Sequence, residues 1–169
     1  MTGVQTCALP ICSQLSTARE LLTSSDGQLT RFNGIDLLMN SAMTKVYAAT
    51  DPKRLIIYDG RVGAALGLLA KRYLHSIGHS DEVPSELKFG WGASRSTKRP
   101  NERNPSEENF QFPRLFGNNK DAIHAEMMRG ASNMLVKVAS TIGSNDLTIL
   151  ARLEQALFMI GYNVGSQIR

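Results

Sequence analysis

The stretch from Gly60 to Ser76 constrains the fold most, because its apolar residues follow the period of an α-helix. They recur at three- and four-residue steps and form one stripe: Val62, Ala65, Leu66, Leu69 and Tyr73. Three basic residues are available for the opposite face: Arg61, Lys71 and Arg72. Asp59 precedes the segment and is well placed to cap the helix by accepting backbone N–H bonds. Because the stripe needs a partner face, we expect Leu66 and Leu69 in the core.

The remaining segments also favour helices over strands. Composition, helical spacing and breakers predict further helices at 13–23, 33–49, 121–139 and 146–161. We expect Asn119 or Asp121 to cap the third of these, and Leu153 and Leu157 of the last to be buried. The short apolar run 55–58 fits either a strand or a buried extended connector. The predicted fold class is therefore mostly α, a helical single domain over residues 12–169 with little or no sheet.

Three glycines, Gly60, Gly63 and Gly67, share one side of the helix predicted at 60–76. Glycine lacks a Cβ, so a neighbouring backbone can approach closely. We expect a packing seam at these positions.

The first eleven residues, Met1 to Ile11, resemble the translation of a common sequencing-library adapter. We therefore expect an artefactual segment with few buried side chains and an extended or arbitrary conformation, and a natural chain that begins near Cys12 with an upstream part missing. Cys7 then falls within the adapter, and the codon of Cys12 starts inside it, so we expect no disulfide, thiolate metal site or cysteine nucleophile. A chain without cysteines of its own suits a reducing cytoplasm.

Other motifs exclude several classes of site. No run approaches the roughly 18 apolar residues of a membrane span, so we expect no membrane partner. His75 and His79 have the i, i+4 spacing of metal ligands, but Gly78 lies between them where the helix should end. We expect surface or capping histidines there, and neither a metal nor a cofactor. Dinucleotide-binding, P-loop and nucleophile-elbow motifs are absent from the sequence.

The charge of the chain is concentrated between Lys88 and Lys120. This segment holds seven basic residues and three glutamates, which accounts for the whole net charge of +4. It also holds Trp91, Phe110, Phe112 and Phe116 among prolines and glycines. Basic residues interleaved with aromatics suit a nucleic acid, whose phosphates and bases they bind. A solvated loop with its aromatics packed on the body is the other interpretation.

Two short motifs resemble helix-hairpin-helix DNA glycosylases. The first runs from Thr44-Lys45-Val46-Tyr47 through an apolar connector to Tyr58-Asp59-Gly60-Arg61-Val62, and the second spans 153–162. In that family a lysine-bearing helix leads to an aspartate that caps a helix. The chain is similar to bacterial 8-oxoguanine-glycosylase-like proteins, some encoded beside phage-defence genes, over about residues 33–162.

This resemblance implies a mechanism of base excision. The target base would be flipped out of the duplex, and Asp59 would stabilise positive charge on the deoxyribose. Lys45 would attack the sugar carbon and form a Schiff base. Four basic residues would hold phosphates: Arg95, Lys98, Arg99 and Arg103.

The chain departs from the family at its hairpin. The family carries Gly-x-Gly there, whereas this sequence has Asn40-Ser41-Ala42-Met43. Three interpretations stay open: a DNA glycosylase-like protein, active or degenerate, that binds or acts on damaged or foreign DNA; a catalytically inert helical module that binds a protein or nucleic-acid partner; and an unrelated helical enzyme whose active residues lie upstream.

Overall fold

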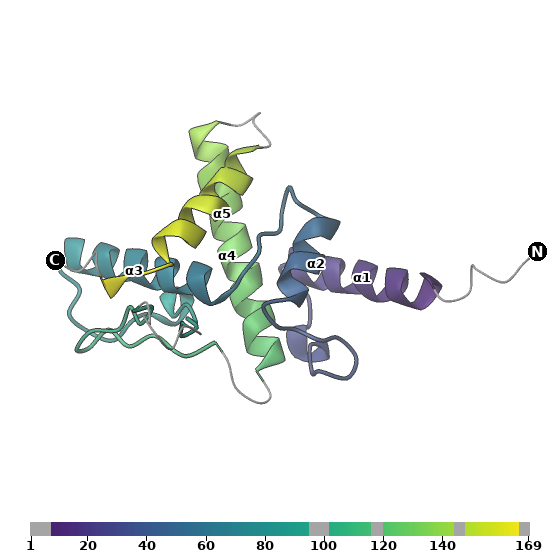
Figure 1. Cartoon of the computed structure of the whole chain (residues 1–169), viewed down its shortest axis with the longest axis horizontal. Helices are drawn as coiled ribbons and strands as arrows, with labels where there is room; N and C mark the ends of the chain where they lie inside the picture. The colour runs from purple at the N-terminus through teal and green to yellow at the C-terminus, as the bar shows by residue number, and fades with distance from the viewer. Residues whose placement is uncertain (1–7, 95–101, 116–119, 144–147, 166–169) are drawn as a thin grey trace, which may run out of the picture.

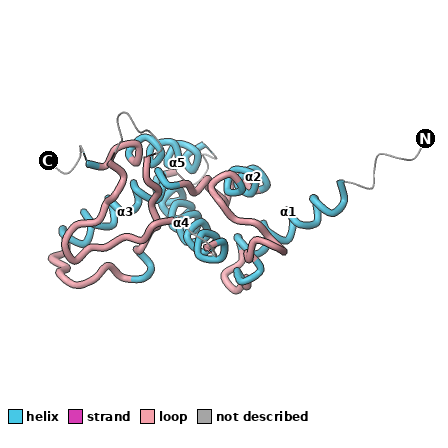
Figure 2. Tube along the Cα trace, turned by 60° about the horizontal axis from the view of Figure 1, so that its bottom comes forward, coloured by secondary structure: helices cyan, strands magenta, loops and turns pink. Residues whose placement is uncertain are grey.

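The computed structural model describes residues 8–94, 102–115, 120–143 and 148–165. The α-helices of these residues are α1 (Ala8–Thr23), α2 (Met43–Thr50), α3 (Gly60–Ser76), α4 (Asp121–Ile142) and α5 (Thr148–Ile160). Two 3-10 helices, η1 (Leu29–Arg31) and η2 (Ser85–Leu87), lie between them. Over the described ranges there is no strand, only two isolated β-bridges (Figure 2). The mostly α prediction is confirmed, and 55–58 is a connector.

Helix α4 lies at the centre of the arrangement. Helices α1 and α2 lie on one side of it and α3 on the other, in both views (Figures 1 and 2). Helix α5 packs against α4 and also contacts α3. One buried core joins residues of all five helices and of the loop before α4. No helix in the described part of the chain is long and apolar enough to cross a membrane.

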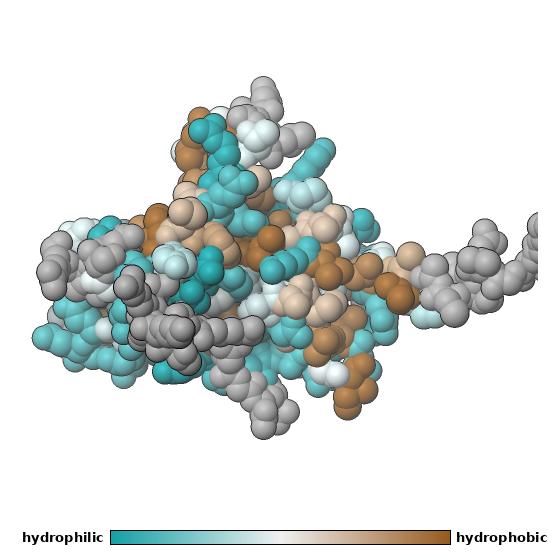
Figure 3. Space-filling model, viewed as in Figure 1, coloured by the Kyte–Doolittle hydropathy of each residue, from teal (hydrophilic) through white to brown (hydrophobic). Residues whose placement is uncertain are grey.

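The helix predicted at 33–49 is wrong in its first half, because α2 begins only at Met43. The Asn33 side chain accepts hydrogen bonds from the backbone N–H groups of Ile35 and Asp36, and Gly34 has a positive φ of 81°. The Asn40 side chain likewise accepts from Met43 N. Asparagine side chains that bond nearby backbone groups favour turns over helix. Ile35 is consequently 89% exposed on this loop, which carries a hydrophobic projection in Figure 3.

The start of α4 also differs from the prediction. Lys120 occupies the N-cap position and makes no side-chain cap bond, while Asn119 lies outside the described residues. The carboxylate of Asp121 instead accepts a hydrogen bond of 2.7 Å from Met39 N. Asp121 therefore ties the loop before α2 to α4.

The N-terminal end of α1 contains part of the adapter-like segment. Residues 8–11 form its first turn, so this part is helical and not extended. Ile11 is 59% exposed, and residues 1–7 lie outside the described part of the chain. The adapter origin stays a prediction.

Helix α3 has the predicted bounds but a wider buried face. Val62, Ala65 and Leu66 are buried as expected, whereas Leu69 is 41% exposed, so its predicted burial is wrong. Lys71, expected on the solvent face, is buried. Lys71 is buried because the loop after α3 covers that flank of the helix. In α5, Leu157 is buried and Leu153 is only partly buried.

Candidate nucleic-acid interface

Asp59 caps α3 as the sequence predicts. Its backbone is extended, with φ −116° and ψ −178°, and its Oδ1 accepts hydrogen bonds from Arg61 N (2.8 Å) and Val62 N (3.1 Å). These bonds satisfy two N–H groups that the first turn of a helix leaves open. The cap holds the backbone of Arg61 in the first turn of α3.

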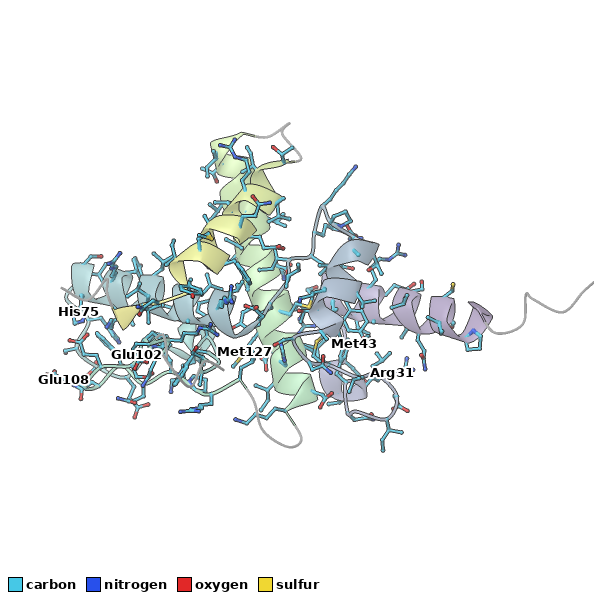
Figure 4. The ribbon with its side chains drawn as sticks, in the orientation of Figure 1. Arg31, Met43, His75, Glu102, Glu108 and Met127 are labelled. Carbon is cyan, nitrogen blue, oxygen red and sulfur yellow. The ribbon has the colours of Figure 1, made fainter. Side chains whose placement is uncertain are left out.

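The predicted glycine seam is present on α3. Gly92 N donates a hydrogen bond of 3.1 Å to Gly60 O. A Cβ on Gly63 would lie 1.7 Å from Gly90 O, and one on Gly67 would lie 2.6 Å from the Pro105 ring. On its other side, Gly90 packs against Met127 of α4 (labelled in Figure 4). The backbone of the loop between α3 and α4 therefore lies directly on α3.

The aromatic residues order the described part of the loop, as expected. Trp91 and Phe112 are buried, and Trp91 Nε1 donates a hydrogen bond to Phe112 O. Backbone bonds join Trp91 N to Pro113 O and Leu115 N to Trp91 O. The guanidinium of Arg114 lies 4.7 Å from the centre of the Trp91 ring. The loop is thus irregular but packed.

An ion pair between a buried lysine and a half-exposed glutamate also fastens this loop, and the sequence did not suggest it. The Nζ of Lys71 lies 2.7 Å from Oε2 of Glu107. The Lys71 side chain is 4% exposed and that of Glu107 is 44% exposed. The hydrogen bond from Lys71, together with its charge, lowers the pKa of Glu107. The pair draws the segment after residue 102 onto α3.

A cluster of two arginines and two aromatic rings forms where α3 begins and α5 ends. The guanidinium of Arg61 lies 4.3 Å from the centre of the Phe158 ring and 5.2 Å from that of Tyr162. Arg103 Nε donates a hydrogen bond of 3.4 Å to Tyr162 O. We call Arg61, Arg103, Phe158 and Tyr162 the arginine–aromatic cluster. Figure 4 shows the neighbouring Glu102 in the loop beside α3.

Gly161 brings the two helices together at this cluster. A Cβ at this position would lie 1.8 Å from Arg61 O. The end of α5 therefore touches the first turn of α3 backbone to backbone. A larger residue would separate Tyr162 from Arg61.

The carboxylates of Asp59 and Glu154 lie near the start of α3. Glu154 Oε2 accepts a hydrogen bond of 2.8 Å from Ile57 N. Burial raises the pKa of Glu154, the hydrogen bond from Ile57 opposes the rise, and the charge of Asp59 adds to it. Burial also lowers the pKa of Arg103, and the nearby charge of Arg61 lowers it further, whereas Asp59 acts in the opposite direction. Negative charge from Asp59 therefore acts on the cluster and partly offsets its positive charge.

The predicted catalytic pair is not joined by any contact. Lys45 is exposed on α2, on the opposite side of α4 from α3 (Figures 1 and 2). Both residues are described, and neither a hydrogen bond nor an ion pair links Lys45 to Asp59. Of the predicted phosphate-binding residues, Arg103 joins the cluster, while Arg95, Lys98 and Arg99 lie outside the described residues.

The three histidines pack against aromatic rings or bind a backbone carbonyl. The rings of His75 and His79 both contact Phe110. His124 is buried, and its Nε2 donates to Tyr58 O at 2.9 Å. Burial lowers the pKa of His124, which favours its neutral form. Within the ranges that the structure describes, no group of three or more His, Cys, Asp or Glu residues could hold a metal ion.

An apolar hollow is a separate feature of the described structure. Its volume is about 430 Å³, and it lies between α3, α4 and α5. Leu69, Tyr73, Val138 and Leu153 are among its lining residues, which explains the exposure of Leu69. Tyr73 is the sole ionisable residue in the lining, so the hollow lacks the paired groups that acid–base catalysis uses.

The arginine–aromatic cluster is thus the place where a sequence-predicted binding residue, Arg103, meets further charged and aromatic groups. Sequence reasoning missed Arg61, Phe158 and Tyr162 as members. The i, i+4 spacing of Phe158 and Tyr162, which would put both rings on one face of a continuing helix, was the available signal. No protein-family model, curated protein or solved structure matches the chain.

Proposed function

We propose that this chain is a helical module that binds nucleic acid, with DNA as the favoured ligand, through the arginine–aromatic cluster. One observation carries the proposal: Arg61 lies on the rings of Phe158 and Tyr162, and Arg103 approaches the same tyrosine. Guanidinium groups bind phosphate oxygens, and they also stack on rings and bases.

The chain around Arg103 supports the same proposal. In the sequence, Arg95, Lys98 and Arg99 precede it within eight residues. Lys71 and the glycine seam fasten the described part of this segment to α3. Basic residues that closely precede Arg103 in the sequence add positive charge, and nucleic-acid binding depends on such charge.

The arrangement favours binding over the lyase chemistry that the glycosylase resemblance implies. Schiff-base chemistry needs an amine and a carboxylate at one pocket. Lys45 and Asp59 come from helices on opposite sides of α4, and Asp59 already serves as a helix cap. We therefore expect no adduct when the protein is treated with borohydride on DNA that contains oxidised guanine. A trapped adduct that disappears with Lys45→Gln would instead support the glycosylase.

Salt-dependent binding tests the proposed function. Fluorescence anisotropy with a labelled DNA oligonucleotide should give a binding constant that falls steeply as NaCl rises. In the double variant Arg61→Gln/Arg103→Gln, the slope of log K against log salt should shrink by about 1.4 to 1.8, because two phosphate contacts are lost.

Arg31→Gln is the matched control, because Arg31 is exposed on η1, away from the cluster (Figure 4). This variant removes one positive charge, half the change of the double variant, and should keep the wild-type slope. Salt-independent binding, no binding, or equal slopes for both variants would remove the proposal.

A further inference from the structure

Three large side chains are exposed at the end of α5 and in the turn that follows it. Phe158 is 37% exposed, Met159 73% and Tyr162 50%, all within five residues of the chain. Tyr162 keeps half of its surface open even though the Arg61 guanidinium lies near its ring. These rings therefore remain accessible to a ligand at the cluster that also holds Arg61 and Arg103.

The charges around the cluster suit a single strand better than a duplex. Asp59 caps the turn of α3 that carries Arg61, and its charge also acts on Arg103, so the positive charge of the cluster is partly offset. Duplex DNA carries one negative charge per roughly 1.7 Å of its axis, and binding it tightly requires an excess of cations. Where the positive charge is partly offset in this way, other contacts must contribute to the affinity.

Stacking on the exposed rings supplies those contacts. Each base stacked on an aromatic side chain improves affinity by about 5- to 150-fold. Bases inside a duplex are already stacked on their neighbours and do not offer a free face. We infer that the preferred ligand is unpaired nucleic acid, with bases on Tyr162 and Phe158 and phosphates on Arg61 and Arg103. This inference rests on the proposed function.

Comparison of an unpaired with a paired strand tests the inference. Anisotropy titrations would use labelled oligo-dT and a duplex of the same length, at one salt concentration. The wild-type protein should bind oligo-dT more tightly than the duplex. Tyr162→Ala should weaken oligo-dT binding by about 5- to 150-fold. Tyr162→Phe, which restores a ring, should bind oligo-dT more tightly than Tyr162→Ala.

Tyr73→Ala is the matched control, because Tyr73 is a 56% exposed tyrosine on α3 at the apolar hollow. It should bind oligo-dT like the wild type. Tight duplex binding, or a Tyr162→Ala variant that binds oligo-dT normally, would overturn the inference while the arginine variants could still support DNA binding. Failure of the wild type to bind either ligand would remove the proposed function as well.

Discussion

Replacing Glu107 by glutamine should destabilise the protein more than replacing its partner Lys71 by methionine. Glu107→Gln leaves an ammonium group that is 4% exposed without its counter-charge. Breaking a fully buried pair in this way costs about 3 to 5 kcal/mol. Because Glu107 is 44% exposed and water reaches one side of the pair, we expect about 1 to 3 kcal/mol.

Lys71→Met removes the buried charge together with its desolvation penalty and keeps an unbranched side chain. The remaining Glu107 carboxylate is solvated, so the cost should stay below about 1.5 kcal/mol. In the double variant Lys71→Met/Glu107→Gln no buried charge remains. It should therefore be more stable than Glu107→Gln alone.

Urea unfolding followed by tryptophan fluorescence measures these differences. Trp91 is the only tryptophan of the chain, and it is buried in the loop that the pair fastens. Linear extrapolation gives the free energy of unfolding of each variant. The reasoning is refuted if Lys71→Met proves the more destabilising single change, or if the double variant is as unstable as Glu107→Gln.

Two further predictions concern other sites. Gly63→Ala should destabilise the protein by at least about 1 to 3 kcal/mol, because the new Cβ meets the Gly90 carbonyl. Gly130→Ala has no atom within 4 Å of its new Cβ and should stabilise the protein by about 0.5 to 1 kcal/mol. Equal unfolding midpoints of the two variants in urea would contradict the seam. Burial raises the pKa of Glu154, so its stabilising contribution is present below the ordinary glutamate pKa of about 4.3 and is lost as pH rises through the folded value. Glu154→Gln keeps an acceptor for Ile57 N and should melt at a higher temperature than the wild type at pH 7, with the difference vanishing near pH 4; a lower Tm at pH 7 would count against this burial effect.

The parts of the fold that depend on neighbouring residues could be predicted from the sequence. Helix α3, its Asp59 cap and its glycine seam follow from residues within a few positions of one another, and all three are present. The helix expected from residue 33 failed, although its apolar spacing was helical. There the side chains of Asn33 and Asn40 compete for backbone N–H groups, and spacing alone does not reveal that competition.

Residues far apart in the sequence make up most of the candidate interface. Arg61 meets Phe158 and Tyr162 only because α5 returns to the first turn of α3. The spacing of Lys71 put it on the polar face of its helix, but the loop that carries Glu107 covers that position. The pairing of Lys45 with Asp59 was an expectation from resemblance, and no contact between them supports it. Tertiary contacts of this kind leave little trace in local patterns.

The glycine seam has a consequence for how the protein opens. Because the loop backbone rests on α3 without an intervening layer of side chains, separating the two means breaking the bond from Gly92 N to Gly60 O. The irregular segment around Trp91 and Gly92 should then belong to the same cooperative unit as the helix. In native-state hydrogen exchange, the amides of Trp91 and Gly92 should be protected nearly as long as those in the middle of α3, although they belong to neither a helix nor a sheet.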